Sequence, residues 1–287
     1  MHPLVKWTAL TLAICLPLSA QAHRAWMLPS ATVLSGEDPW VTVDAAISND
    51  LFYFEHFSMH IAGVGDVSTQ PAGQRARQAA KLHVFAPDGS DVKPQNGAIG
   101  RYRSTFDLHL TQKGTYKLAI ANSGLFASWK EGQENKRWMG KAEDFAKQVP
   151  ANAAELKVAQ NSSRMEVFVT SGNPTTSVLK TTGVGLELAP ITHPNDLFAG
   201  EAAEFSLLLD GKPAAGVEVS VIPGGNRYRD ELGEIKTTSD ANGKISITWP
   251  NAGMYWLEAE LSSKEGVSAP ASERRASYSA TLEVLAP

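Results

Sequence analysis

Hydrophobic and polar residues alternate along most of the chain in short runs that are rich in Val, Ile, Thr and aromatic residues. Such runs are typical of half-buried β-strands. Turn residues separate them, in stretches such as "PDGSD", "QKGTY", "LDGKP", "DANGK" and "PNAGM". The clearest strand patterns are "PWVTVDAAI", "STFDLHLT", "RMEVFVTSG", "EFSLLLDG" and "GKISITWP". We therefore expect a mostly β fold built from antiparallel β-sandwiches.

The spacing of these strands predicts two domains. An N-terminal β-rich domain is expected over residues 23–175, and a linker rich in Thr, Ser, Gly and Pro at about 172–184. Residues 185–287 hold six or seven candidate strands in about 100 residues, which is the size of one immunoglobulin-like sandwich.

One segment of the N-terminal domain departs from the strand pattern. Residues 136–159, "KRWMGKAEDFAKQVPANAAELKVA", are rich in Ala, Lys and Glu. This composition favours one or two short helices, of which Pro150 would end the first. We predict a short helical insertion there.

The first 22 residues have the three-part layout of a secretory signal peptide. Lys6 precedes an apolar run over residues 9–18, and Ala20-Gln21-Ala22 forms an A-x-A cleavage site. The apolar run is too short to span a bilayer. We expect a periplasmic protein without stable membrane insertion, whose mature chain begins at His23.

Composition narrows the chemistry that the mature chain can perform. Cys15 is the only cysteine and would leave with the signal peptide, so a metal would be held by nitrogen and oxygen alone. The net charge of −4, without a basic run, argues against a nucleic-acid partner. The nucleophile elbow, the zinc-protease motif and the phosphate-binding loop are also missing, so no enzyme class is indicated.

His23 is the first candidate metal ligand. At a free amino terminus, the α-amine and the imidazole Nδ1 of one residue can chelate an ion in a compact ring. Imidazole nitrogen suits Ni, Co, Cu and Zn. The alternative is that cleavage falls at a histidine by chance.

Four further residues are candidates to complete the site. His56 and His60 are four residues apart, which places them together on a helix but about 13 Å apart on a strand. The aromatic surroundings favour a strand or an irregular edge, so His56 is the stronger candidate. Asp107 and His109 alternate with apolar residues, and they share one strand face about 6.5–7 Å apart. For all four, the alternative is an ordinary structural role.

Two other histidines have simpler explanations. His83 has no carboxylate nearby in sequence, so a structural role is expected. His193 precedes Pro194, which restricts it to extended backbone. We expect its imidazole to bind backbone groups at a rigid connection between the domains.

Several segments resemble the DUF4198 family: "AHRAWMLPS", "SNDLFYFEH", "YRSTFDLHLTQKGTYKLA", "THPNDLFAGEAAEFSLLLDGKP" and "DANGKISITWPNAGMYWLEA". The resemblance covers nearly the whole mature chain. It implies a periplasmic component of cobalt or nickel uptake, with a NikM-like annotation. The family histidine behind the signal corresponds to His23, and that of "LFYFEH" to His56. The chain lacks the Met-rich or His-rich tract of a dedicated metal chaperone.

The leading hypothesis is a non-enzymatic transition-metal-binding protein, accessory to a membrane metal transporter or an outer-membrane receptor. One alternative is an envelope interaction module with incidental histidines, in which Trp249, Tyr255 and Trp256 would line a ligand surface, although such residues more often lie in the core. Another is a copper oxidase of the histidine-brace type, which also begins with a mature histidine.

Overall fold

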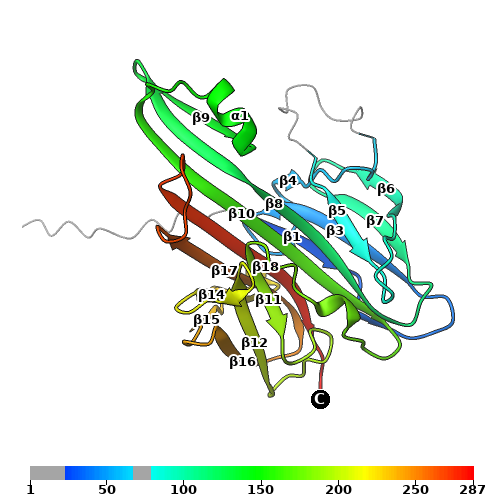
Figure 1. Ribbon diagram of the computed structural model, residues 1–287. Coiled ribbons are helices and arrows are strands. Elements are labelled where there is room, and N and C mark those ends of the chain that lie inside the picture. The colour runs from blue at the N-terminus through cyan, green and yellow to red at the C-terminus, as the bar shows by residue number, and fades with distance from the viewer. Residues whose placement is uncertain (1–22, 67–78) are drawn as a thin grey trace, which may run out of the picture.

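The computed structural model describes residues 23–66 and 79–287 and divides their strands among three sheets (Figure 1). The predicted signal peptide, residues 1–22, lies outside the described residues. The N-terminal sheet has the order β1 (Arg24–Pro29), β3 (Trp40–Ser48), β7 (Ser104–His109), β6 (Gln95–Ile99), with β4 (Phe57–Ser58) paired to β3.

A long sheet runs through the middle of the molecule. Its order is β15 (Ile235–Thr238), β14 (Glu218–Pro223), β17 (Gly253–Ser263), β18 (Glu273–Val284), β10 (Ala154–Ser171), β8 (Gly114–Glu131), β5 (Leu82–Phe85). Two strands lie off this path: β2 (Val33–Leu34) pairs with β10, and β9 (Glu134–Gly140) pairs with β8.

The C-terminal sheet has the order β11 (Leu186–Pro190), β12 (Ala202–Leu209), β13 (Lys212–Pro213), and β16 (Lys244–Thr248) also pairs with β12. The α-helix α1 (Ala142–Gln148) and the short 3-10 helices η2 (Ser177–Leu179) and η3 (Asn226–Tyr228) complete the described elements.

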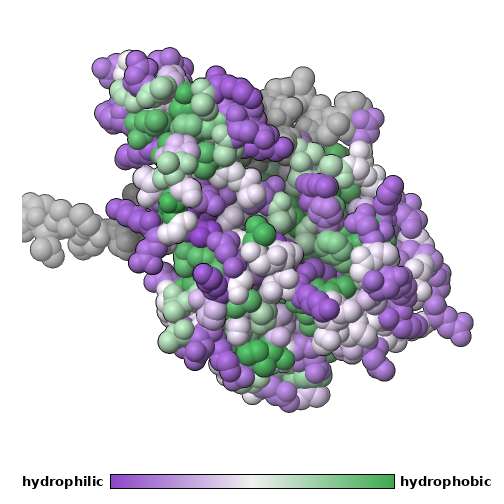
Figure 2. All heavy atoms as spheres, in the orientation of Figure 1, coloured by the Kyte–Doolittle hydropathy of each residue, from purple (hydrophilic) through white to green (hydrophobic). Residues whose placement is uncertain are grey.

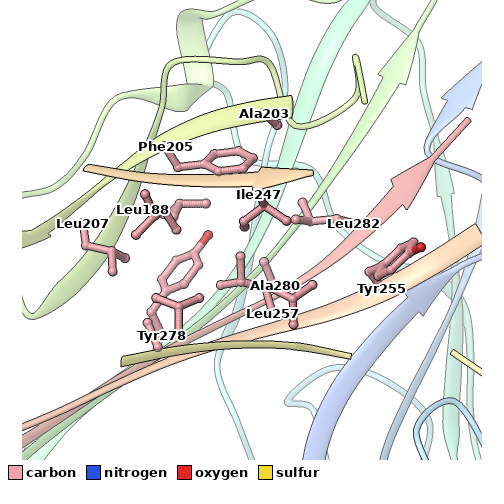
Figure 3. Packing of buried hydrophobic residues seen from close by; sticks show 14 of the residues in the cluster. Leu188, Ala203, Phe205, Leu207, Ile247, Tyr255, Leu257, Tyr278, Ala280 and Leu282 are labelled. Carbon is pink, nitrogen blue, oxygen red and sulfur yellow. The ribbon is translucent and has the colours of Figure 1, made fainter. Parts of the chain in front are cut away.

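The N-terminal and C-terminal sheets cover opposite faces of the long sheet. On β17, Tyr255 and Leu257 point into the core beneath the C-terminal sheet, which Figure 3 shows. Trp256, between them in sequence, points the other way and packs with Trp26 of β1. Because successive side chains of a strand point to opposite faces, this one sheet contributes residues to the cores of both sandwiches. A second core, around Val167 and other buried residues, fills the space beneath the N-terminal sheet.

The predicted mostly β fold with sandwich architecture is confirmed. A corner tyrosine occurs in each half: the Tyr116 hydroxyl accepts a hydrogen bond from Gln112 N at 2.7 Å, and the Tyr255 hydroxyl donates to Asn251 O at 2.7 Å. A tyrosine that binds backbone just upstream is a hallmark of immunoglobulin-like sandwiches. The structure adds one feature that was not expected: β10 pairs in parallel with β18, and this pairing joins the two halves in one sheet.

The helical insertion predicted over residues 136–159 is much shorter than expected. Only Ala142–Gln148 is helical, and the flanks form β9 and the start of β10. Both flanks pair with β8, at Trp138↔Ala127 and Val158↔Ala127. Sheet pairing thus overrides the helix propensity of Ala, Lys and Glu. Together these elements form an arm that extends past both sandwiches, and in Figure 2 hydrophobic residues show on it between hydrophilic ones.

The three aromatic residues considered for a ligand surface are core residues instead. Trp249 and Tyr255 lie in the C-terminal core and Trp256 packs beneath β1, each at most 2% exposed. Their burial argues against the interaction-module hypothesis in that form. Within the part of the chain that the structure describes, no helix is long and apolar enough to cross a membrane.

Candidate metal centre

The end of β3 brings His23 and His56 together. Strands β1 and β4 pair antiparallel with opposite edges of β3, with Arg24 opposite Ser48 and Phe57 opposite Ile47. His23 directly precedes β1 and His56 directly precedes β4. Because both strands run against β3, their first residues meet at its carboxyl end.

The imidazole rings of His23 and His56 are in contact. Their centroids lie 4.0 Å apart, with the ring planes tilted by 38°. The Phe57 ring packs edge-on against both, at 6.3 Å from His23 and 4.0 Å from His56. His23 is exposed and His56 is partly buried. The pair is thus open to solvent on the His23 side and backed by an aromatic ring on the other.

Asn49, at the end of β3, orders the surrounding polar groups. Its side-chain Oδ1 lies 2.7 Å from His23 Nδ1, its backbone N–H donates to Glu55 Oε1 at 2.7 Å, and its carbonyl accepts from Arg24 Nη1 at 3.5 Å. An amide oxygen accepts, so His23 Nδ1 carries the proton in this arrangement and Nε2 carries the lone pair. Chelation through Nδ1 and the α-amine therefore requires Asn49 to release the imidazole.

His60 does not join this pair. It is 9% exposed, and its backbone carbonyl accepts from Ala80 N at 2.7 Å. Within residues 23–66 and 79–287, no three His, Cys, Asp or Glu side chains are grouped closely enough to hold a metal ion. In the described residues, His23 and His56 are the two predicted site residues whose side chains the fold brings into contact.

Asp107 and His109 lie at the opposite end of β3. Asp107 pairs with Thr42 and His109 with Trp40, six and eight residues before Ser48. At about 3.3 Å per residue, these separations are about 20 Å and 26 Å. The prediction that Asp107 and His109 complete a shell around His23 is wrong, because register along β3 and not the shared strand face decides which residues meet.

These two residues have other partners. Asp107 accepts hydrogen bonds from Thr42 Oγ1 at 2.7 Å and Asn96 Nδ2 at 2.9 Å, which lower the pKa of its carboxyl. His109 stacks on Trp40 at 4.3 Å, and its Nε2 hydrogen-bonds Asp38. That bond is the main cause of a lowered pKa at Asp38. Both residues thus belong to surface polar contacts of the N-terminal sheet.

The remaining histidines have local partners. His83 Nδ1 lies 3.8 Å from Asp91 Oδ1, a carboxylate that β-turn geometry brings close. His193 Nδ1 accepts from Asn195 N at 3.0 Å, and its Nε2 lies 3.1 Å from Thr175 O. Burial lowers the pKa of His193. A neutral imidazole with both nitrogens occupied holds the connection between the halves.

Sequence reasoning missed Asn49, Glu55 and Arg24 as neighbours of the pair. "SND" after a strand pattern signals a turn, but it does not show which residues lie beside that turn. The pairing of β1 with β3 supplies this information.

Fold and site together define the class of protein. It is a mostly β protein in which two sandwiches share one sheet, and a histidine pair open to solvent lies at the end of a sheet. The family model "Domain of unknown function (DUF4198)" matches residues 20–263. The chain therefore belongs to the DUF4198 family. No curated protein sequence matches it significantly.

Solved structures show only distant likeness. The D0-D1 domain of Intimin has a TM-score of 0.21 at 10% identity, covering 90% of this chain and 97% of that one. Dimeric latent PorU from Porphyromonas gingivalis has a TM-score of 0.18 at 11% identity, covering 93% of this chain and 21% of that one. The Bacillus anthracis TIE protein has a TM-score of 0.16 at 10% identity, covering 93% and 39%. TM-scores this low carry no argument about this chain.

Proposed function

We propose that the mature protein is a periplasmic transition-metal-binding protein that holds its ion with the His23 α-amine and imidazole and with the His56 imidazole. One observation carries this proposal: two histidines 33 positions apart in sequence have ring centroids 4.0 Å apart at the molecular surface. Phe57 and the end of β3 keep the second imidazole in place beside the first.

The donor set decides which ions fit. Two imidazoles and an amine are nitrogen ligands, which suit Ni(II), Co(II), Cu(II) and Zn(II), whereas Mg(II) and Ca(II) prefer oxygen. With metal–nitrogen bonds of about 2.0 Å, two rings on one ion have centroids about 5–6 Å apart. Binding therefore requires the contacting rings to separate by about 1–2 Å. The exposed His23, at the start of the described chain, is the ring with room to move.

The exposed position also suits transfer of the ion. A ligand at a surface-accessible chain end can pass its metal to a partner without opening the fold. We propose an accessory role in nickel or cobalt uptake, with a membrane transporter or outer-membrane receptor as the partner. The ion is then cargo and not a resident cofactor.

Titration calorimetry on protein processed to begin at His23 tests the proposal. Ni(II) should bind with 1:1 stoichiometry, and His56→Ala should lower the affinity on the order of 10-fold or more. His83→Ala is the matched control, since His83 pairs with Asp91 away from the site. Equal Ni(II) affinity in wild type and His56→Ala would exclude the proposed metal site.

The same donor set also fits a copper oxidase of the histidine-brace type. Two imidazoles and an amine that face solvent are the ligands that such a site needs, so this second candidate keeps a test of its own. Cu(II)-loaded protein that consumes no peroxide in the presence of a reductant would exclude it.

A further inference from the structure

The loop that carries His56 is held by the C-terminal half of the molecule. Asn226, the first residue of η3, accepts a hydrogen bond from Leu51 N through its Oδ1 at 2.9 Å. Its Nδ2 donates to Asp50 Oδ1 at 3.0 Å. One amide side chain, 175 residues from Leu51 and 176 from Asp50 in sequence, thus binds both a backbone and a side-chain group at the start of this loop.

Arg227 adds a second contact to the same loop. Its guanidinium lies 4.1 Å from the centroid of the Tyr53 ring, and its Nη1 lies 3.6 Å from Asp50 Oδ2. An ion pair this exposed contributes little alone. Stacking of a planar guanidinium on an aromatic ring adds orientation as well as attraction. Arg227 therefore fixes Tyr53, three residues before His56.

Turn and side-chain contacts, and not a β-ladder, fix the course of the loop: Tyr53 N donates to Asp50 O at 3.3 Å, and the Phe52 and Phe54 rings lie 5.4 and 5.6 Å from the Trp26 ring. No β-pairing is present between Ser48, where β3 ends, and Phe57, where β4 begins. Phe52 adopts a φ of 61°, a left-handed conformation that costs energy for a residue other than glycine. Leu51 is buried against Ile222 and Trp256 of the C-terminal half. A strained segment of this kind persists only where surrounding contacts impose it.

We infer that Asn226 and Arg227 are positioning residues, which hold the loop over residues 50–56 so that His56 meets His23. This inference rests on the proposed function. Without these contacts the loop samples more conformations, and metal binding must then restrict it at a cost in affinity. The two halves of the molecule thereby form one metal site, although only the N-terminal half supplies side-chain ligands.

By thermodynamic linkage, the coupling between these contacts and metal binding acts in both directions. If the contacts favour metal binding, the bound metal favours the contacts by the same free energy. A partner that pulls η3 away from the loop would weaken the hold on the metal, which gives a transfer partner a place to act.

A double-mutant cycle with Ni(II) alone as the probe tests this inference. Asn226→Ala and Arg227→Met, in protein that begins at His23, should each lower the Ni(II) affinity on the order of 10-fold, the size of effect seen when groups that orient a ligand are lost. In the His56→Ala background the same substitutions should change the affinity less than 2-fold, because they act through His56. Arg227→Lys keeps the charge and should recover part of the loss.

Matched controls separate positioning from general damage. Asn242→Ala and Arg275→Met lie on the C-terminal sandwich, and Arg275 pairs only with Glu273 among the described ion pairs. Both should keep wild-type affinity. Should Asn226→Ala fail to fold, Arg227→Met carries the test.

The outcomes are distinguishable. If His56→Ala lowers the affinity while Asn226→Ala and Arg227→Met do not, the inference is overturned and the proposed function stands. Equal losses in both backgrounds would also overturn it, because a general structural effect does not depend on His56. If His56→Ala leaves the affinity unchanged, the metal site and the inference fail together.

Discussion

At the scale of single residues, the candidate centre depends on an exchange of partners at His23. Its Nδ1 bonds to the Asn49 side chain in the described structure, yet Nδ1 is the nitrogen that closes a six-membered chelate ring with the α-amine and the metal. Asn49 is thus a competitor of the metal. The sequence was sufficient to choose the two histidines, but it did not show how the fold brings them together. His23 and His56 were singled out and lie together, whereas Asp107 and His109 share a strand face but lie at the wrong end of β3.

Removing the competing amide should strengthen metal binding. Asn49→Ala abolishes the 2.7 Å contact with His23, and a hydrogen bond of this kind has a net value of about 0.5–1.5 kcal/mol. We expect Ni(II) affinity to rise roughly 2- to 10-fold, measured by calorimetry. Weaker binding would indicate that His23 uses Nε2 and needs Asn49 to orient the ring.

The chelate itself depends on a free α-amine. One glycine added before His23 converts the α-amine of His23 into a peptide N–H, which removes its chelate with Nδ1, and we expect the Ni(II) affinity to fall on the order of 10-fold or more, as for the loss of a ligand. The comparison is with protein that begins at His23, titrated under the same conditions. The same affinity in both proteins would exclude the amine as a ligand.

At the scale of elements, the strand with which a segment pairs determined its secondary structure where the local sequence did not. Alternation predicted strands well, because it reports directly which face is buried. It failed at residues 136–159, since helix-favouring Ala, Lys and Glu also occur in β9 and β10, where β8 provides hydrogen bonds. It also gave no sign of the parallel β10–β18 pairing, which joins residues more than 100 positions apart. That junction carries a buried polar network.

Arg164 is the centre of this network. Its Nη1 donates to Glu166 Oε1 at 3.2 Å, and its Nη2 donates to Thr182 Oγ1 at 2.8 Å and lies 3.4 Å from Glu187 Oε1. Tyr278 of β18 donates to Glu166 Oε2 at 3.0 Å. Burial raises the pKa of Glu166, although Lys117 and Arg164 oppose this shift. The network thus links β10 to β18 and to the connection between the halves.

Arg164→Met should destabilise the protein strongly. The substitution keeps much of the side-chain volume but removes the cation that pairs with buried Glu187 and leaves Glu166 with Lys117 as its one cation among the described residues, at 4.0 Å. Breaking a buried pair in this way costs about 3–5 kcal/mol. Urea unfolding followed by circular dichroism gives the loss. Arg275→Met, which removes an exposed pair with Glu273, is the matched control and should change little. Equal stability of the two variants would show that the network does not support the junction.

At the scale of the whole molecule, both halves depend on one sheet and touch again where β1 crosses β17. Arg24 of β1 lies 5.5 Å from the Trp256 ring centroid, and Trp256 Nε1 donates to Ala25 O at 3.2 Å. Glu258 lies on the same face of β17. Its pKa is raised to about 7, mainly by burial and also by the neighbouring Glu260, while Arg24 opposes the shift. No local pattern in the sequence shows that this glutamate is buried near Arg24 of β1, so its charge state is a property of the assembled halves.

Glu258 should make stability depend on pH. Its folded pKa of about 7 lies above the ordinary value of 4.5, so between these values the folded state binds more protons than the unfolded state. The free energy of unfolding therefore falls as pH rises from about 4.5 to about 7 and levels off above that range. Glu258→Gln removes this contribution and should lose less stability over the same interval. His193, whose pKa is lowered, acts in the opposite direction in both proteins, so the difference between their urea-unfolding curves at pH 5 and pH 8 isolates Glu258. Parallel pH profiles would mean that Glu258 is ionised in the fold and that β1 leaves it accessible to water.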